Sequence, residues 1–446
     1  MIPSTRRELG ELLRLASPIA LAQFGLMMLG LVDVAFLGRV SVTDLGGASI
    51  GRSISFAATS IGLGIASALE PLASQAIGAN ELGRAWSSLL TILRALLLLW
   101  IPSVAFSYAL TLLLPTLGVA PALAAPARAF LLAQAPSLFL FPAFFAIKSF
   151  LQAHRSTGPA LVAAVVANVV NVAACGLLVR GDSALRFMGL PAVGLPALGA
   201  LGAGLANSIA NFVLCAIVFV AATRRAAPPS STGPTLGRVL ALGMPMGLQL
   251  AAEIGVFATI GVIAGLLGER AVSAHQIALS LASFTFMGAQ GISSATAVRV
   301  GHAIGAGRSA RSSGVLGLLL GAAYMTMTSL VFLAVPALLM GFFTDDREVL
   351  TIGVDLVRIA ALFQIFDGIQ SVAAGALRGA GDVKFPFWAN LGAHWVIGFP
   401  TALALCFGLR LGPAGLWWGL LAGLAIAAVL LARRFVIVSR GPIARV

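Results

Sequence analysis

Four carboxylates interrupt otherwise apolar stretches of the sequence: Asp33, Glu70, Glu253 and Asp367. An acidic side chain at the centre of a membrane-spanning helix costs about 2.5–3.5 kcal/mol on insertion scales, so it normally has a partner or a function. Glu70 lies a few residues from a polar connection and can reach an interface, which leaves a structural and a functional role equally open. The other three have no acidic counterpart in an internal repeat of the sequence, and we interpret them as functional.

The depths of Glu253 and Asp367 predict that both can contribute to one cation site. They lie about 14 and about 10 residues from the inner ends of their predicted helices, a difference in height of about 6 Å. Two carboxylates in a low-dielectric cavity cannot both ionise cheaply, so at least one is expected to take up a proton, or to exchange it for Na⁺ or an organic cation. Asp33 lies near the outer end of its helix in the other half of the chain and is predicted to be a second site.

Polar side chains at helical spacing accompany these acids. Each can line a cavity or hold two helices together by a hydrogen bond, and the sequence leaves both roles open. The candidates are Asn168, Asn171, Gln249, Gln364 and His394.

The elements that position these residues are predicted to be membrane-spanning helices. Hydrophobic residues form 59% of the 446 residues and charged residues 10%, against about a quarter in soluble proteins. A span needs about 20 apolar residues, so twelve spans leave only short connections and no room for a soluble domain. The fold class is therefore an all-α polytopic membrane protein. The predicted spans are 12–38, 46–74, 87–114, 123–151, 159–179, 196–222, 239–267, 272–298, 313–341, 349–377, 385–407 and 413–432.

The chain contains two copies of one unit. A shift of 227 positions places Pro18 on Pro245 and residues 76–79 (Ala-Ile-Gly-Ala) on the identical residues 303–306. The same shift places Asp33 on Ile260 and Leu26 on Glu253. We predict six-helix lobes at 1–226 and 239–446, joined by a Pro-rich cytoplasmic linker at 227–238.

The net charge of +13 is explained by orientation. Most Lys and Arg residues fall in alternate connections, which the positive-inside rule places in the cytoplasm together with both termini. This pattern predicts a multi-pass protein of the cell (inner) membrane that contacts lipid and does not bind nucleic acid. The three cysteines form no metal or redox spacing, so we predict no resident metal and no cofactor other than a coupling ion. We also predict that the protein is a monomer.

One motif points to a different class of protein. Residues 47–51 read Gly-Ala-Ser-Ile-Gly, which fits the G-x-S-x-G nucleophile elbow of hydrolases. That elbow requires a strand before it and a helix after it, whereas here it opens a predicted membrane span. An intramembrane hydrolase is therefore a weak alternative, for which Ser49 would be the nucleophile.

Several motifs together resemble the multidrug and toxic compound extrusion (MATE) family over essentially the whole chain. They are Ser74–Ala79, Arg299–Gly307, Ser273-Ala274-His275-Gln276 and Leu377-Arg378-Gly379 with Asp382. The resemblance implies a twelve-helix, two-lobed antiporter that exports organic cations in exchange for Na⁺ or H⁺. A flippase for lipid-linked precursors within the same superfamily is the nearest alternative, and its cavity is expected to carry Arg or Lys.

The resemblance also implies roles for individual residues. Asp33 matches the acid of the family's first helix, Asn168 and Asn171 match asparagines of its fifth helix, and Glu253 and Asp367 match the acids of the seventh and tenth helices in the NorM-like branch. Two positions depart from the pattern. Phe363 stands one turn before Asp367, where some NorM-like members have a tyrosine, and Gly288-Ala289 follows Met287, where a proline is frequent.

Overall fold

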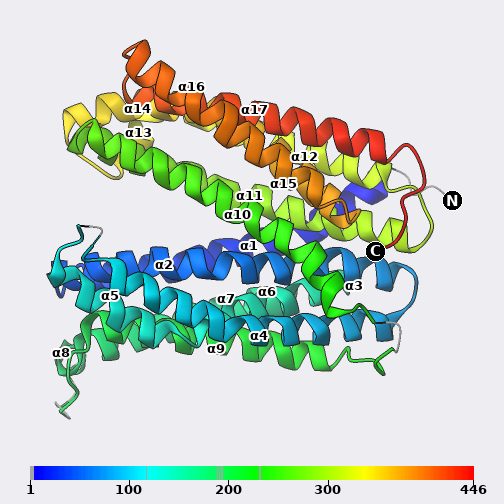
Figure 1. Ribbon diagram of the computed structural model, residues 1–446, viewed down its shortest axis with the longest axis horizontal. Coiled ribbons are helices and arrows are strands. Elements are labelled where there is room, and N and C mark those ends of the chain that lie inside the picture. Colours follow the sequence, from blue (N-terminus) through cyan, green and yellow to red (C-terminus); the bar gives the residue numbers. More distant parts are fainter. Residues whose placement is uncertain (1–4, 117, 188, 190, 192–193, 231–232) are drawn as a thin grey trace. The chain divides into compact units, whose positions relative to one another are not determined.

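The computed structural model describes residues 5–446 except 117, 188, 190, 192–193 and 231–232, and this part of the chain is helical with short connections (Figure 1). The helices of the first half and the linker region are α1 (Thr5–Leu37), α2 (Val42–Ser67), α3 (Leu69–Gly78), α4 (Leu82–Leu113), α5 (Pro121–Gln134), α6 (Ser137–Ala153), α7 (Gly158–Arg180), α8 (Asp182–Phe187) and α9 (Gly199–Thr223). Those that follow are α10 (Leu236–Leu266), α11 (Glu269–Gly305), α12 (Arg311–Ala334), α13 (Pro336–Gly341), α14 (Arg347–Gly379), α15 (Lys384–Leu391), α16 (Phe399–Leu403) and α17 (Pro413–Val438).

Most of these helices are long and apolar enough to cross a membrane. Ten segments meet that criterion within the described residues, and the bent pair α5–α6 makes an eleventh. The remaining predicted span corresponds to α11, which is 37 residues long but more polar than the others. The predicted all-α, polytopic fold is therefore confirmed. The helix α10 begins at Leu236, within the predicted linker 227–238.

Prolines explain why several predicted spans are interrupted. A proline ring clashes with the carbonyl group four residues earlier, and it disfavours helical backbone in the residue before it. α2 ends at Ser67, four residues before Pro71. Val335, which precedes Pro336, has φ −134° and ψ 47° and separates α12 from α13. α5 and α6 meet at Ala135-Pro136 with a bend of 47°.

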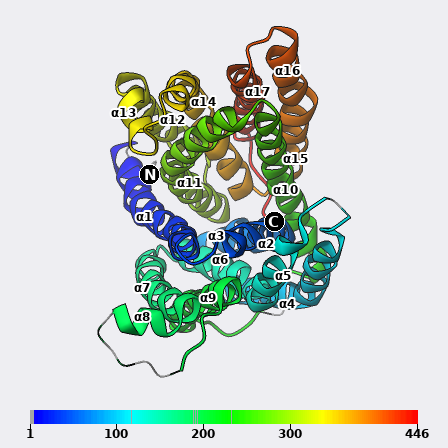
Figure 2. The same ribbon diagram turned by 90° about the vertical axis from the view of Figure 1, so that its left-hand side faces the viewer.

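The structure divides into two compact units, which we call unit 1 and unit 2. Unit 2 comprises Ala22–Leu69 and Leu82–Gly247. Within it α7 packs against α9, and α2 packs against α4, α5 and α6 (Figure 2). Its core includes Ala48, Phe130 and Cys175, all essentially inaccessible.

Unit 1 comprises Met1–Leu21, Glu70–Glu81 and Leu248–Val446. Within it α14 packs against α11, α12 and α17. The N-terminal segment is held to this unit by Arg299 of α11, whose guanidinium forms buried ion pairs with Glu8 and Glu11. These units follow packing contacts, whereas the predicted lobes at 1–226 and 239–446 follow the sequence repeat, so that division of the chain stays a prediction.

Equivalent positions of the repeat make matching contacts inside unit 1. A Cβ atom added at Gly78 would collide with the carbonyl oxygen of His302, and one added at Gly305 would collide with that of Gln75. Under the shift of 227, Gly78 is equivalent to Gly305 and Gln75 to His302. The repeated Gly-containing turns thus pack directly on each other, at a distance that only glycine permits.

A second pair of equivalent glycines also makes matching close contacts, one in each unit. In unit 2, Gly64 of α2 packs on the backbone of Gly247 in α10. In unit 1, Gly291 of α11 packs on Ala20 of α1. Under the same shift Gly64 is equivalent to Gly291 and Ala20 to Gly247. The inner part of each repeat's first helix therefore packs against the second helix of the other copy.

The predicted span 385–407 is an irregular helix in the structure. α15 continues into a π-helical segment at Gly392–Gly398, then into α16 and a second π-helical segment at Ala404–Gly408. A π-helical turn holds an extra residue, is rare, and occurs frequently at functional sites. The first segment presents Trp395, whose indole Nε1 donates to the carbonyl oxygen of Ala252 in α10 at 3.0 Å.

Candidate functional site

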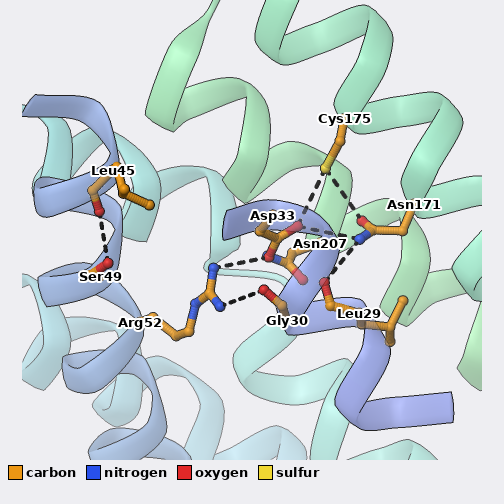
Figure 3. A network of polar contacts seen from close by, with 9 residues as sticks. All are labelled: Leu29, Gly30, Asp33, Leu45, Ser49, Arg52, Asn171, Cys175 and Asn207. Carbon is orange, nitrogen blue, oxygen red and sulfur yellow. Dashed lines mark hydrogen bonds and ion pairs between the residues drawn. The ribbon is translucent and has the colours of Figure 1, made fainter. Parts of the chain in front are cut away.

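Asp33 is the centre of a polar network inside unit 2, and its side chain is only 1% exposed (Figure 3). One carboxylate oxygen, Oδ2, accepts from Asn207 Nδ2 of α9 at 2.6 Å and is 3.2 Å from Arg52 Nη2 of α2. The other oxygen, Oδ1, accepts from Asn171 Nδ2 and Cys175 Sγ of α7, each at 3.3 Å. Three helices thus converge on one acid of α1.

Asn168 and Asn171 were predicted as a pair, but the structure gives them different contacts. Asn171 is buried and reaches both Asp33 and the carbonyl oxygen of Leu29. Asn168 Nδ2 donates to the carbonyl oxygen of Gly25 in α1 at 2.7 Å and to that of Ala164 at 2.8 Å. It therefore joins α7 to α1 by a hydrogen bond and does not contact Asp33.

The Asp33 network includes three residues that were not on the list of candidates: Arg52, Cys175 and Asn207. Arg52 lies near the start of the predicted span 46–74. Cys175 lies in an apolar stretch of the sequence and belongs to the core of unit 2. Asn207 carries a usable signal, since Asn207 and Asn211 form an i, i+4 polar pair within an apolar stretch.

Glu253 lies in unit 1, where amide groups surround its carboxylate. Gln249 Nε2, one turn earlier in α10, donates to Glu253 Oε1 at 3.1 Å. Gln370 Nε2 of α14 donates to the same oxygen at 3.1 Å and to Asn390 Oδ1 of α15 at 2.8 Å. The glutamate is half-buried, whereas Gln370 and Asn390 are buried. The predicted Gln249–Glu253 spacing thus gives a direct hydrogen bond.

Asp367 lies in the same unit and has a different environment. Its side chain is half-buried, and it makes no hydrogen bond or ion pair within the described chain. Asp367 stands three residues before Gln370 on α14, and Gln370 donates to Glu253 Oε1, so α14 holds Asp367 within about one helical turn of a direct contact with Glu253. The structure therefore brings Glu253 and Asp367 together, one with amide donors and one without.

Phe363 and Gln364 precede Asp367 on α14 by four and three residues, and His394 lies in the neighbouring irregular helix. Gln364 is buried, and its Oε1 accepts from Thr285 Oγ1 at 2.6 Å and from Thr328 Oγ1 at 2.9 Å. His394 is buried in the first π-helical segment. Phe363 contacts Phe257 and Trp417 edge-on, with ring centroids 6.2 Å and 5.7 Å apart. As a phenylalanine, it offers no hydroxyl oxygen to a cation.

Glu70, whose role the sequence left open, forms a structural ion pair in unit 1. Its Oε2 lies 3.1 Å from Arg378 Nε, and the Arg378 guanidinium also donates to Ser293 Oγ at 3.3 Å. Both ionised side chains are largely buried. A buried charge needs such a partner, which accounts for an acid in the first turn of α3.

The comparisons with known proteins agree with this architecture. The family model MatE matches residues 18–177 and again 245–403. The two matches begin 227 residues apart, which is the shift that relates the halves of the sequence. A solved structure of a eukaryotic MATE transporter is similar to this fold, with a TM-score of 0.85 at 23% sequence identity, covering 98% of each chain. A structure of a MATE protein in complex with MaD3S gives a TM-score of 0.85 at 15% identity over 97% of this chain and 96% of that one.

Curated relatives match over nearly the full length. A "Probable multidrug resistance protein NorM" of Rhodopseudomonas palustris is 36% identical, covering 96% of this chain and 92% of the relative. A protein of the same name from Deinococcus radiodurans is 34% identical, covering 97% of this chain and 96% of the relative. A "Multidrug resistance protein NorM" of Burkholderia vietnamiensis is 34% identical, covering 97% of this chain and 95% of the relative. Together with the duplicated family match and the shared fold, these relatives show that the chain belongs to the MatE family, in its NorM-like branch.

Proposed function

We propose that this protein is a multidrug efflux transporter of the cytoplasmic (inner) membrane that exchanges organic cations for Na⁺ or H⁺. Its relatives are named multidrug resistance proteins, which supports efflux of organic compounds. Both termini are proposed to be cytoplasmic, because the basic residues cluster in the connections on that side. The transported cation and the coupling ion act as substrates, and no resident cofactor is proposed.

The observation that carries the proposal is the pairing of Glu253 and Asp367. Both carboxylates are half-buried in one unit, and Gln370, one turn after Asp367 on α14, donates directly to Glu253. A pair of acids in this setting favours binding of a cation, because the cation relieves their repulsion. Ion and organic cation then compete for the same negative charge, which is the requirement for exchange. Gln249, Gln370 and Asn390 hold Glu253 in place.

The observed contacts do not favour the alternative functions. The side chain of Ser49, the nucleophile of the hydrolase alternative, donates to the carbonyl oxygen of Leu45 at 2.8 Å within a continuous α2 (Figure 3). The relatives are named for multidrug resistance, and the family model covers both halves of the chain, which argues against hydrolysis. A flippase for pyrophosphate-linked lipids needs an uncompensated cation, whereas the guanidinium of Arg52 is paired with Asp33.

Dye efflux from inverted vesicles, with a Na⁺ gradient and a pH gradient imposed separately, tests the proposal. We expect one of the two gradients to drive transport of a cationic dye. Glu253→Gln and Asp367→Asn should each lower ion-driven efflux at least about tenfold, since each removes one interaction of more than about 1.4 kcal/mol with the cation. Glu269→Gln, which neutralises an exposed acid at the start of α11, serves as the matched control and should transport normally. Efflux at wild-type rates in both site variants would contradict the proposed site.

A further inference from the structure

The carboxylate of Asp33 has no free hydrogen-bonding position. An ionised carboxylate has about four lone-pair positions on its two oxygens. Oδ2 is occupied by Arg52 and Asn207, and Oδ1 by Asn171 and Cys175. With the side chain 1% exposed, neither a proton nor a metal ion can approach an oxygen without displacing one of these four partners.

Arg52 differs from the other three partners because it carries a charge. A guanidinium cannot be deprotonated in a protein, so Arg52 is a permanent cation at this site. Its Nη1 donates to the carbonyl oxygen of Gly30 at 3.0 Å, and a Cβ atom at Gly30 would lie only 3.3 Å from that nitrogen. The glycine therefore leaves the space in which the guanidinium lies.

The Arg52 side chain also has room to move. It is 33% exposed, in contrast to the buried Asp33 that it pairs with. Of the neutral partners, Asn171 and Cys175 are completely buried, and Asn207 approaches Asp33 more closely than Arg52 does. Displacing the guanidinium therefore requires less rearrangement than displacing the buried neutral partners. Among the described residues in contact with Asp33, Arg52 and Cys175 are the only charged or titratable ones.

We propose that Arg52 is a tethered cation that competes with the coupling ion for Asp33. While the guanidinium is in place, the pair is neutral and Asp33 does not bind a further cation. When it leaves, an uncompensated carboxylate remains in a buried position, and that carboxylate takes up a proton or a metal cation. Loading of this site is thus linked to a side-chain movement on α2. The inference deepens the proposed cation-coupled function, on which its role in transport rests, by naming the residue that decides when Asp33 is available.

Carbodiimide labelling tests the competition without any need for transport. An apolar carbodiimide reacts with protonated carboxyl groups, and peptide mass spectrometry assigns the adduct to Asp33 in purified, full-length protein. An opposite charge at this distance changes the ratio of ionised to protonated carboxyl about tenfold or more. We therefore expect Arg52→Gln to label Asp33 at pH 7 at least about tenfold faster than wild type. Arg52→Lys, which keeps a cation, should label slowly.

Asn207→Ala is the matched control, because it removes the neutral donor from the same carboxylate oxygen and leaves Arg52 in place. Asn207→Ala removes one hydrogen bond but no charge, so it should speed labelling less than Arg52→Gln does, and clearly slower labelling in Asn207→Ala than in Arg52→Gln supports competition by charge. Equally fast labelling in both variants would show that any lost hydrogen bond loosens Asp33, and would overturn the proposal. Wild-type labelling in a monodisperse, normally melting Arg52→Gln protein would also overturn it. If Arg52→Gln does not fold, Arg52→Met keeps most of the apolar stem and gives the same comparison.

A transport measurement separates this inference from the proposed function. In the dye-efflux assay, Arg52→Gln should lower the concentration of coupling ion needed for half-maximal efflux, and should lower it more than Arg52→Lys, which keeps a positive charge. If no ion gradient drives efflux in wild type, the proposed function fails while the labelling result still decides whether Arg52 occupies Asp33. If efflux is ion-driven but labelling is the same in all variants, the function stands and the tethered-cation proposal fails.

Discussion

Two glutamines of α14 lie three residues on either side of Asp367, and only one of them reaches a carboxylate. Gln370 donates to Glu253 and Asn390, whereas Gln364 accepts from the hydroxyl groups of Thr285 and Thr328. Residue type and spacing are the same for both. The difference arises from which neighbouring helix each side chain faces, and a single sequence does not contain that information.

At the scale of single residues, Gln370→Leu should therefore change ion binding. It removes one of the two amide donors of Glu253, and a hydrogen bond to a charged group contributes about 1.5–3 kcal/mol. The free carboxylate is then less well stabilised and binds its cation more tightly. We expect the ion concentration for half-maximal efflux to fall by about tenfold, as measured in vesicles over a series of ion concentrations.

Gln364→Leu is the control for this prediction. It leaves the two half-buried hydroxyl groups of Thr285 and Thr328 without their shared acceptor, which should destabilise the protein by about 1–3 kcal/mol. The loss of stability should be near the lower end of that range, because both threonines also donate to backbone carbonyl oxygens. Thermal unfolding in detergent measures this effect. A change in ion dependence in Gln364→Leu as large as that in Gln370→Leu would contradict the assignment of the two roles.

At the scale of elements, the start of α14 depends on one side chain outside the membrane span. Asp346 is its N-cap residue, and its Oδ1 accepts from the backbone N–H groups of Glu348 at 2.8 Å and Val349 at 3.1 Å. The hydrogen bond from Val349, followed by that from Glu348 and the charge of Arg270, holds the pKa of Asp346 below its usual value. Since α14 carries Asp367 and Gln370, this cap supports the helix that positions Asp367 beside the Glu253 region.

We expect Asp346→Ala to lower the unfolding temperature more than Asp345→Ala, which removes the same charge from the neighbouring exposed residue. A depressed folded-state pKa stabilises the protein above the unfolded value of about 3.9, and this contribution is lost as the pH falls through the folded pKa. The difference between the two variants should therefore be constant from about pH 8 to pH 5 and should narrow below about pH 4. Thermal unfolding over that pH series would reveal an equal effect of both substitutions if the cap were unimportant.

The existence and approximate limits of the helices could be predicted from the sequence, because a membrane span leaves a long apolar run. Breaks such as the one before Pro336 could also be anticipated from the proline. The π-helical segments around His394 could not, since they depend on how that helix packs. The depth of Asp33 in its helix could also be predicted from the sequence. Its partners Arg52 and Asn207 could not, because they lie on other helices and reach Asp33 only through packing.

At the scale of the whole molecule, the three carboxylates that we propose to bind cations, Asp33, Glu253 and Asp367, predict that transport moves net charge. If two cations enter for each singly charged drug that leaves, one net charge crosses the membrane, which contributes about 2.3 kcal/mol per 100 mV. This free energy can maintain a ratio of drug concentrations across the membrane that is about 50-fold larger. We expect a current on supported membranes during transport of a singly charged dye, with less charge moved per dye molecule in Asp33→Asn.

Parallel measurement of dye flux makes this prediction decisive. Dye flux without current in wild type would show that one cation is exchanged for each drug molecule. An unchanged ratio of charge to dye in Asp33→Asn would show that Asp33 does not carry a transported ion.

The reciprocal contacts of the repeat have a consequence for how the two halves can differ. Gly78 packs on His302 and Gly305 on Gln75, and the equivalent residues Ser74 and Gly301 meet each other. This is the arrangement of an isologous interface, in which a residue i contacts j and j contacts i. Two identical half-length chains could form it, but every substitution in such a dimer would then appear twice. Because one gene encodes both copies here, an acid can stand at Asp33 while its counterpart is Ile260, and at Glu253 while its counterpart is Leu26. Covalent fusion thus frees a symmetric scaffold to carry asymmetric chemistry.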